Sequence, residues 1–456
     1  MIRGHVSAKA SAPVLRRISS VPLSCSKGMG IVKKLTVAFL AVFLFASQSV
    51  FFQPNRRAEV VTPDISVLLD NLPIRFDVPP QIIDGRALVP FRLIAQALNI
   101  SVDWDPNNRT IFASDGTTMV MLQINNKIAQ VNDMPFTLDS PPIIINGRTL
   151  IPLRFFSEAF GCQVDWIAKT RTITIISPPR AMNVIGFYAL GAGEASSWLD
   201  LFGAPYPDIT EGNTDIVREL ALGWYTINEQ GNLLVRNTRN AWQRPFGWEI
   251  VLARAKEFGL KTEMVVHETN RDGLLTALLD NEQAKLKAVN SIVQESALYG
   301  GVNLNLEGLG LYATGETQIR IRESFTRFIS MLSQPLRDVG KTLTLTIHPP
   351  NSSYRGYDYQ ALGKLADRII IMAHDYGPTP EPLNRVVQAV EMALAVVPSE
   401  KLVLGISAPS ETAESIIEKI GVAKRYRLQG ISLWRLGLLS ENMWGAVRKT
   451  ISKRAQ

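Results

Sequence analysis

Cysteine is nearly absent from this 456-residue sequence, in which only Cys25 and Cys162 occur. If the N-terminal segment that carries Cys25 is removed from the mature protein, neither an internal disulfide nor a cysteine metal cluster can form. No cysteine stands directly after the apolar run near the N-terminus, which excludes a lipid anchor at that place. An exported protein with so few thiols fits a bacterial cell envelope better than a eukaryotic secretory route.

Acidic residues are missing from the first 52 residues, whose basic residues are Arg3, Lys9, Arg16, Arg17, Lys27, Lys33 and Lys34. This segment accounts for the whole formal net charge of +7, so the remainder of the chain is electrically balanced. A basic surface for nucleic acid therefore has no support, and we expect no nucleic-acid partner. The hydrophobic content of 46% with 20% charged residues is typical of a globular protein.

Residues 1–52 have the form of an export signal. Lys33 and Lys34 precede an uncharged apolar run over 35–46, and small polar residues follow it. A basic region, a short apolar core and small residues after it are typical of a signal peptide. Extended to Phe52, the run is long enough for an uncleaved N-terminal membrane anchor. Met29 is an alternative start. Either way we expect an exported protein in the envelope, the wall or the exterior of a bacterium.

The next module is a sequence repeat. Residues 82–111 and 144–173 match each other, with Asp84 and Asn146, like Trp104 and Trp166, 62 residues apart. Duplication of one supersecondary unit explains this spacing. In each copy an Asp-Gly or Asn-Gly pair predicts a tight hairpin turn, and a short helix follows over 90–98 or 152–160. A strand that ends in Val-Asp-Trp completes the unit.

This repeat resembles the stalk-type domain named after the N-terminal region of copper amine oxidases, because both copies carry G-R-x-L-[VI]-P-x-R. The resemblance covers about 60–177, which contains no histidine, so the family name implies no copper here. Two interpretations remain open. Arg92, Arg154 and the two tryptophans form a wall-binding surface, or the arginines bond locally and the tryptophans are core. The resemblance implies a spacer or attachment domain.

The remaining chain, 181–456, predicts a (β/α)8 TIM barrel of the α/β class. Pro178 and Pro179 close the stalk, and strand and helix patterns then alternate. Expected strands are 183–188, 219–225, 261–266, 302–306, 342–347, 368–373, 402–406 and 430–434. Expected helices include 247–258, 281–297, 318–339 and 383–397. An open doubly wound sheet would need a glycine-rich phosphate loop after its first strand, and Gly191 and Gly193 are too few for that.

Aromatic and acidic residues gather at the expected C-terminal strand ends, where barrel enzymes place their chemistry. They are Tyr188, Trp224, Tyr225, His267, Glu268, Glu307, His348, His374, Asp375, Tyr376 and Trp434. Flat apolar rings that alternate with acids suit a sugar ligand. The three histidines and Glu268 also suggest a metal site, but close ligand spacing is absent, so we expect no metal and no cofactor.

The stretch from Gly300 to Gly308 alternates strictly between apolar and polar residues, as a β-strand does. Val302, Leu304 and Leu306 occupy one face. Asn303, Asn305 and Glu307 occupy the other, which we expect to face a cavity, because buried amides and acids need partners.

This row resembles the D-G-x-D-x-D-x-E signature of family 18 glycoside hydrolases, the chitinase-like enzymes. Glu307 falls on the acid, whereas Gly300, Asn303 and Asn305 replace the three aspartates. Residues 371–377 and 430–437 are similar to the family's sixth and eighth strands, with His374 where the family has tyrosine. The layout is closest to the spore-cortex and peptidoglycan N-acetylglucosaminidases.

The resemblance implies substrate-assisted retaining hydrolysis of N-acetylglucosamine-containing cell-wall glycan, either peptidoglycan or a chitin-like polymer. Glu307 would be the general acid/base, Asn305 would orient the acetamido group, and Asp375 would assist. The residues expected to bind substrate are Asn303, Tyr188, Trp224, His374, Tyr376 and Trp434. Because the aspartates are replaced, a non-catalytic glycan-binding barrel is the alternative.

Overall fold

A computed structural model describes residues 64–189, 195–236 and 243–453. All of these residues belong to one compact unit of the chain. The expected export signal and the residues 191–193 lie outside the described ranges. Within those ranges, every helix is too short or too polar to cross a membrane.

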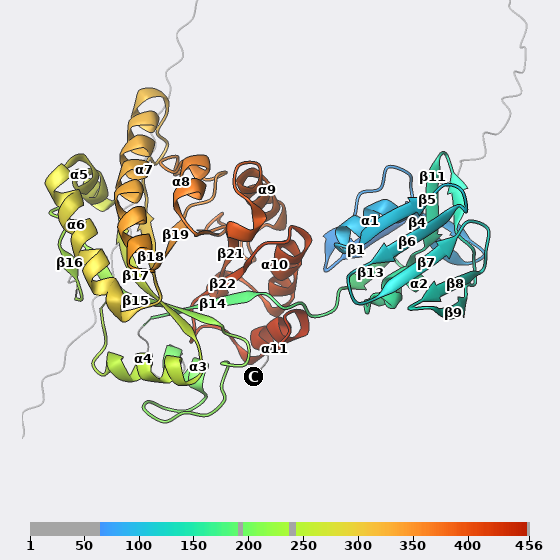
Figure 1. The fold of residues 1–456 in the computed structure, drawn as a ribbon, viewed down its shortest axis with the longest axis horizontal. Helices are drawn as coiled ribbons and strands as arrows, with labels where there is room; N and C mark the ends of the chain where they lie inside the picture. Colours follow the sequence, from blue (N-terminus) through green and yellow to red (C-terminus); the bar gives the residue numbers. More distant parts are fainter. Residues whose placement is uncertain (1–63, 190–194, 237–242, 454–456) are drawn as a thin grey trace, which may run out of the picture. The chain divides into compact units, whose positions relative to one another are not determined.

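The stalk consists of three small sheets and two short helices (Figure 1). The first sheet contains β12 (Gln163–Ile167), β13 (Thr172–Ile176), β1 (Ser66–Leu69) and β2 (Leu72–Pro73). The second contains β10 (Ile143–Ile145), β11 (Arg148–Pro152), β4 (Arg86–Pro90) and β3 (Gln81–Ile83). The third contains β5 (Ser101–Asp105), β6 (Thr110–Ser114), β7 (Met119–Gln123), β8 (Ile128–Val131) and β9 (Met134–Thr137). The helices are α1 (Phe91–Ala97) and α2 (Leu153–Ala159).

The predicted duplication is confirmed by these elements. In each copy an antiparallel hairpin, β3–β4 or β10–β11, leads into a short helix and then a strand. The hairpin turns at Asp84 and Asn146 have φ of 52° and 50°, followed by glycines at 73° and 72°. Two successive positive φ angles are the turn that an Asn-Gly or Asp-Gly pair favours. The copies meet where β4 pairs antiparallel with β11.

The second module is a closed parallel barrel, as predicted. In the described residues its strands follow the order β14-β22-β21-β20-β19-β18-β17-β15, and β14 pairs with β15 to close the ring. The strands are β14 (Asn183–Tyr188), β15 (Glu219–Ile227), β17 (Lys261–Thr269), β18 (Gly301–Glu307), β19 (Thr342–Ile347), β20 (Arg368–Ile371), β21 (Leu402–Ser407) and β22 (Gly430–Trp434). The short β16 (Leu233–Leu234) pairs antiparallel with β15.

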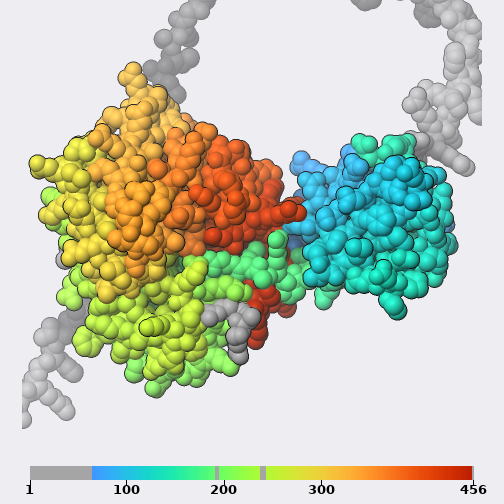
Figure 2. All heavy atoms as spheres, viewed as in Figure 1, coloured from blue at the N-terminus to red at the C-terminus, as the bar shows by residue number. Residues whose placement is uncertain are grey.

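Helices surround the strands on the outside (Figure 1). They are α3 (Ser197–Phe202), α4 (Trp248–Glu257), α5 (Leu274–Asp280), α6 (Glu282–Glu295), α7 (Gly315–Asp338), α8 (Tyr359–Leu365), α9 (Leu383–Leu394), α10 (Ala413–Arg425) and α11 (Glu441–Thr450). Short 3₁₀ turns lie at Arg271–Gly273, Ser296–Leu298, Ser399–Lys401 and Ala408–Ser410. In the space-filling view, side chains cover the strands, and the yellow-to-red surface belongs mainly to these helices and their loops (Figure 2).

The alternation predicted for the central strand is confirmed in β18. Val302, Leu304 and Leu306 pack into the large apolar core between strands and helices. Asn303 and Asn305 point to the other side, the barrel interior, where both are buried. That interior also holds a small apolar cluster made by Ile185, Phe187, Ala221, Val265, Ile370 and Val403. One face of β18 therefore stabilises the fold, and the other leads to the candidate site.

Candidate active site

Glu307 ends β18 at the mouth of the barrel, where neighbouring strands bring imidazoles close to it. His267 lies on β17 beside Asn305, and its Nδ1 is 3.7 Å from Glu307 Oε1. The backbone N–H of Gly308 donates to His348 Nε2 at 3.2 Å. Parallel strands that end at the same edge thus converge on one carboxyl group, as expected for a barrel.

The carboxyl of Glu307 is held in an environment that favours its protonated form. Burial is the largest influence and raises its pKa, while a hydrogen bond from the Asn305 side chain and the charge of His374 lower it. The carboxylate of Asp375 acts in the raising direction. The side chain keeps 26% of its surface exposed, so a ligand can reach it. An accessible carboxyl with a raised pKa suits a proton donor.

Asn305 offers an unused acceptor beside this acid. Its side chain is 3% exposed, and Oδ1 has no hydrogen-bond partner among the described residues. Leaving a buried carbonyl oxygen unsatisfied costs about 1–3 kcal/mol. A ligand N–H at this place would recover that free energy.

Two of the imidazoles are neutral at ordinary pH. Burial lowers the pKa of His267 to about 4, although a hydrogen bond with the Asn305 backbone opposes the shift. Burial also lowers the pKa of His348 to about 4, and its ring stacks on Tyr354 with centroids 4.0 Å apart. Within the described ranges, His, Cys, Asp and Glu form no group of three or more that could hold a metal ion.

His374 and Asp375 form a pair after β20. His374 Nδ1 lies 3.0 Å from Asp375 Oδ2, and this hydrogen bond lowers the pKa of Asp375. Glu381 accepts the backbone N–H groups of Asp375 and Tyr376 at 2.8 and 3.1 Å, which fixes the turn. The Tyr376 hydroxyl donates to Asn351 Oδ1 at 2.8 Å. An ionised Asp375 that accepts from Nδ1 leaves Nε2 as the imidazole atom available to a ligand.

Asn303 was predicted to contact substrate, but the structure gives it another role. Its side chain is fully buried, accepts from Thr346 Oγ1 at 2.8 Å and donates to Glu263 Oε2 at 3.2 Å. Glu263 is in turn ion-paired with Arg368, which also reaches Glu219 at 2.7 Å. Both polar ends of Asn303 are therefore satisfied inside the protein. Its side chain stabilises the barrel interior next to the site and does not contact a ligand.

Tyr188 and Trp224 were also predicted to bind substrate, and the structure corrects this. Trp224 is fully buried and Tyr188 is 5% exposed, and their rings meet edge to face at 6.3 Å within the outer core. Successive strand residues point to opposite faces, and these two point toward the helices. On β14 the inward residue is Phe187. The alternation of residues 183–188 could have identified it.

Trp434 stands at the end of β22 as predicted for an aromatic at the mouth. It is half-buried, packs against the inner cluster, and meets Phe187 edge-on with centroids 5.4 Å apart. A cis peptide bond joins it to Arg435. One side of the indole is thus held by the barrel, while the ring keeps an accessible surface.

Tyr357 is a site residue that the sequence did not indicate. Its hydroxyl donates to the carbonyl of Leu306 at 2.8 Å and accepts from the N–H of Leu309 at 3.4 Å. It therefore holds the chain on both sides of Glu307. It comes from the loop before α8, where no periodic pattern signals an inward residue.

Comparison with known proteins agrees with the resemblance predicted for the stalk and with that predicted for the barrel. Residues 68–175 match the family model described as "Copper amine oxidase N-terminal domain". The sporulation-specific glycosylase YdhD of Bacillus subtilis is 28% identical over 178 residues, covering 36% of this chain and 38% of that protein. The cortical fragment-lytic enzyme of B. subtilis is 24% identical over 146 residues, covering 29% and 32%.

The chain thus spans about a third of the length of these curated relatives. Among solved structures, a chitinase from Chromobacterium violaceum superposes with a TM-score of 0.49 at 19% identity, covering 60% of this chain and all of that one.

Proposed function

We propose that the barrel is a glycoside hydrolase that cleaves N-acetylglucosamine-containing cell-wall glycan, with Glu307 as general acid/base. The observation that carries this proposal is the accessible carboxyl of Glu307, whose pKa burial raises, beside the open acceptor of Asn305. The names of the relatives, a glycosylase and a cortical fragment-lytic enzyme, support the same class. We further propose that the protein is exported and acts in the envelope.

The reaction would follow the substrate-assisted route. Protonated Glu307 gives its proton to the glycosidic oxygen while the carbonyl oxygen of the substrate's own acetamido group attacks C1. The leaving sugar departs with the bonding pair, and a cyclic oxazolinium remains. Glu307, now ionised, takes a proton from water, whose oxygen attacks C1 and reopens the ring. The acid is regenerated and the anomeric configuration is retained.

Asn305 and His374 would position the acetamido group. Asn305 Oδ1 accepts its N–H, and the imidazole of His374, held by the hydrogen bond between Nδ1 and Asp375, borders the acetamido group. An amide supplies no negative charge to the oxazolinium, so we expect turnover to be slower than with a carboxylate at position 305. Trp434 would stack beneath the sugar ring, and Tyr376 would border it.

A second candidate function is a glycan-binding barrel without catalysis. The observation that favours it is the neutral row in β18, where Asn303 and Asn305 stand in place of aspartates. Binding needs the same stacking surface and acceptor but no proton donor.

The test is release of muropeptides from purified peptidoglycan by the wild-type protein and by Glu307→Gln. We expect release by the wild type, and loss of release with retained binding in Glu307→Gln. Glu268→Gln is the matched control, because Glu268 is the neighbouring strand-end acid on β17 and Glu268 Oε1 accepts the N–H of Thr269. If the wild type binds glycan and releases nothing, the binding function is correct. Equal loss in both variants would indicate a structural effect.

A further inference from the structure

Each stalk repeat builds a groove between its short helix and the strand that follows. Arg154, Glu158 and Trp166 line the second groove, and Arg92, Gln96 and Trp104, each 62 residues earlier, line the first. The same positions recur in both copies, so the groove is a feature of the repeat unit. The two grooves differ in what else borders them.

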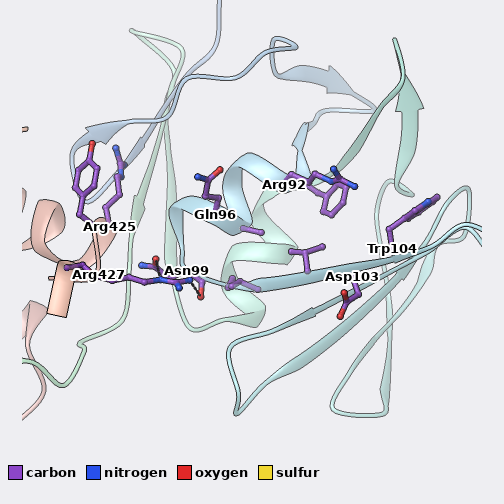
Figure 3. A pocket seen from close by; sticks show the side chains of 13 residues that line it. Arg92, Gln96, Asn99, Asp103, Trp104, Arg425 and Arg427 are labelled. Atoms are coloured by element: carbon purple, nitrogen blue, oxygen red, sulfur yellow. Dashed lines mark hydrogen bonds between the residues drawn. The ribbon is translucent and has the colours of Figure 1, made fainter. Parts of the chain in front are cut away.

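The first groove is bordered by the end of α10 and the residues after it (Figure 3). Arg427 Nε donates to Asn99 Oδ1 at 2.6 Å, and Asn99 Nδ2 donates to the carbonyl of Lys424 at 2.8 Å. Trp104 packs against the apolar core of the stalk. This copy therefore has residues from the barrel module along one side of its groove, which remains a cavity of about 770 Å³.

The second groove is bordered by the stalk alone and forms a cavity of about 830 Å³. Trp166 is 41% exposed and lies outside the stalk core, unlike Trp104. The interpretation in which both tryptophans are core is therefore wrong for Trp166. Phe155 lines the same cavity and meets the exposed Phe136 with centroids 6.2 Å apart. The groove thus offers an accessible aromatic surface formed by Trp166 and Phe155.

The charged groups around this surface are two ion pairs and Asp165, so they are nearly balanced in charge. Arg86 Nε lies 2.6 Å from Asp139 Oδ2, and Arg154 lies 3.4 Å from Glu158. The four side chains of these pairs are 49–69% exposed, so their remaining donors and acceptors face solvent. A balanced set favours a neutral ligand with many hydroxyl groups over an anionic polymer or membrane. Aromatic rings with such polar edges suit a saccharide.

We propose that the second-repeat groove is a separate binding site for an N-acetylglucosamine-containing glycan chain. Trp166 stacks on a sugar ring, the two arginines donate to its oxygens, and Asp139 and Glu158 accept from its hydroxyls. This site rests on the proposed function, because the polymer it holds is the one that the barrel cleaves. The first copy of the repeat joins the stalk to the barrel, and the second holds the enzyme on its insoluble substrate.

The test uses the full chain and insoluble chitin, a polymer without peptides. Binding is measured in the Glu307→Gln background, so that the polymer stays intact, with Trp166→Ala, Trp166→Tyr and Phe112→Ala. Phe112, 38% exposed on β6 and outside the groove, is the matched control. We expect Trp166→Ala to weaken binding roughly threefold to tenfold, as loss of ring stacking does. Trp166→Tyr should retain most of the affinity, and Phe112→Ala all of it.

A salt series and a soluble substrate separate the outcomes. Binding by stacking on a neutral sugar should change little when the salt concentration rises tenfold. Turnover of a soluble N-acetylglucosamine oligomer, measured with Glu307 intact, should be unaffected by Trp166→Ala. Unchanged chitin binding in that variant, or an equal loss in Phe112→Ala, would overturn the proposal. So would conversion of a dimer to a monomer, which would assign the groove to self-association. If neither the wild type nor any variant hydrolyses the oligomer while chitin binding still depends on Trp166, the proposed hydrolase function is wrong and the proposed binding site in the groove is supported.

Discussion

Restoring a carboxylate with Asn305→Asp should make the barrel a faster hydrolase. The side chain is nearly isosteric, is buried at 3% exposure, and has an oxygen without a partner in the described structure. An aspartate there would still accept the substrate N–H and would add a negative charge beside the oxazolinium. Because that charge stabilises the transition state more than the neutral substrate, kcat should rise. A differential stabilisation of about 1.4 kcal/mol gives tenfold.

The same change should move the pH profile. In the wild type the Asn305 amide lowers the pKa of Glu307, and a carboxylate would instead raise it. Two like charges about 4 Å apart at an effective dielectric constant of about 20 repel by on the order of 4 kcal/mol, so one of the two acids keeps its proton. The basic limb of kcat/KM should therefore shift to higher pH. Since the folded pKa rises above the unfolded one, the variant should lose stability as pH rises through that pKa.

The assay is steady-state hydrolysis of a soluble N-acetylglucosamine oligomer from pH 4 to 9, with Asn303→Asp as the matched control. Asn303 donates to Glu263, so a carboxylate at 303 would meet a like charge at 3.2 Å and should destabilise the barrel without any gain in rate. An Asn305→Asp protein that is folded, no faster at any pH and unshifted in profile would refute the reasoning. So would an equal gain in both variants.

Three further outcomes follow from the contacts described above. Trp434→Ala should weaken oligomer binding by roughly 1–3 kcal/mol in calorimetry, with little change in Tm, because a residue at the mouth leaves no core cavity. His267, with a pKa of about 4, should make the free energy of unfolding fall as pH drops from about 6.5 to about 4, by at most roughly 3 kcal/mol. His267→Gln should flatten that dependence in urea titrations. Arg368→Met should destabilise the barrel by roughly 3–5 kcal/mol, because Glu219 and Glu263 stay buried without their cation. A pH-independent stability in the wild type, or an unchanged urea midpoint in Arg368→Met, would contradict the assigned burial.

The sequence predicted the barrel well because each strand and helix carries its own local signal. The strands expected at 183–188, 342–347 and 430–434 have the observed bounds, and the others differ only at their ends. The long helices differ by up to three residues at either end, where caps rather than periodicity decide the boundary. The stalk repeat could be predicted equally well, because both the duplication and the turn-forming Asp-Gly and Asn-Gly pairs can be recognised from residues close together in the sequence.

The site was predicted less completely, because membership in it depends on which face of a strand a residue occupies. Glu307, Asn305 and Trp434 lie at the mouth, as their motifs indicated. Trp224 was predicted to bind substrate because it lies near the end of a strand, but its side chain points toward the helices. Tyr357 contacts the chain around Glu307 only because β19 pairs with β18, which brings together residues about 50 positions apart. Local patterns contain no information about that contact.

The neutral residues of β18 become understandable once the neighbouring strand is considered. Asn303 sits between Thr346 and Glu263, and its amide satisfies a carboxylate that Arg368 already pairs. An aspartate at this position would bring a second negative charge into the barrel interior with no further cation among the described residues beside it. The buried negative charge is thus carried by Glu263 on β17, and a neutral donor on β18 is what that arrangement requires. Asn303 is therefore explained by the buried negative charge of Glu263, and its replacement of an aspartate says little about activity. Asn305 instead hydrogen-bonds the Glu307 carboxyl, and its Oδ1 has no partner among the described residues, so the question of catalysis rests on these two residues.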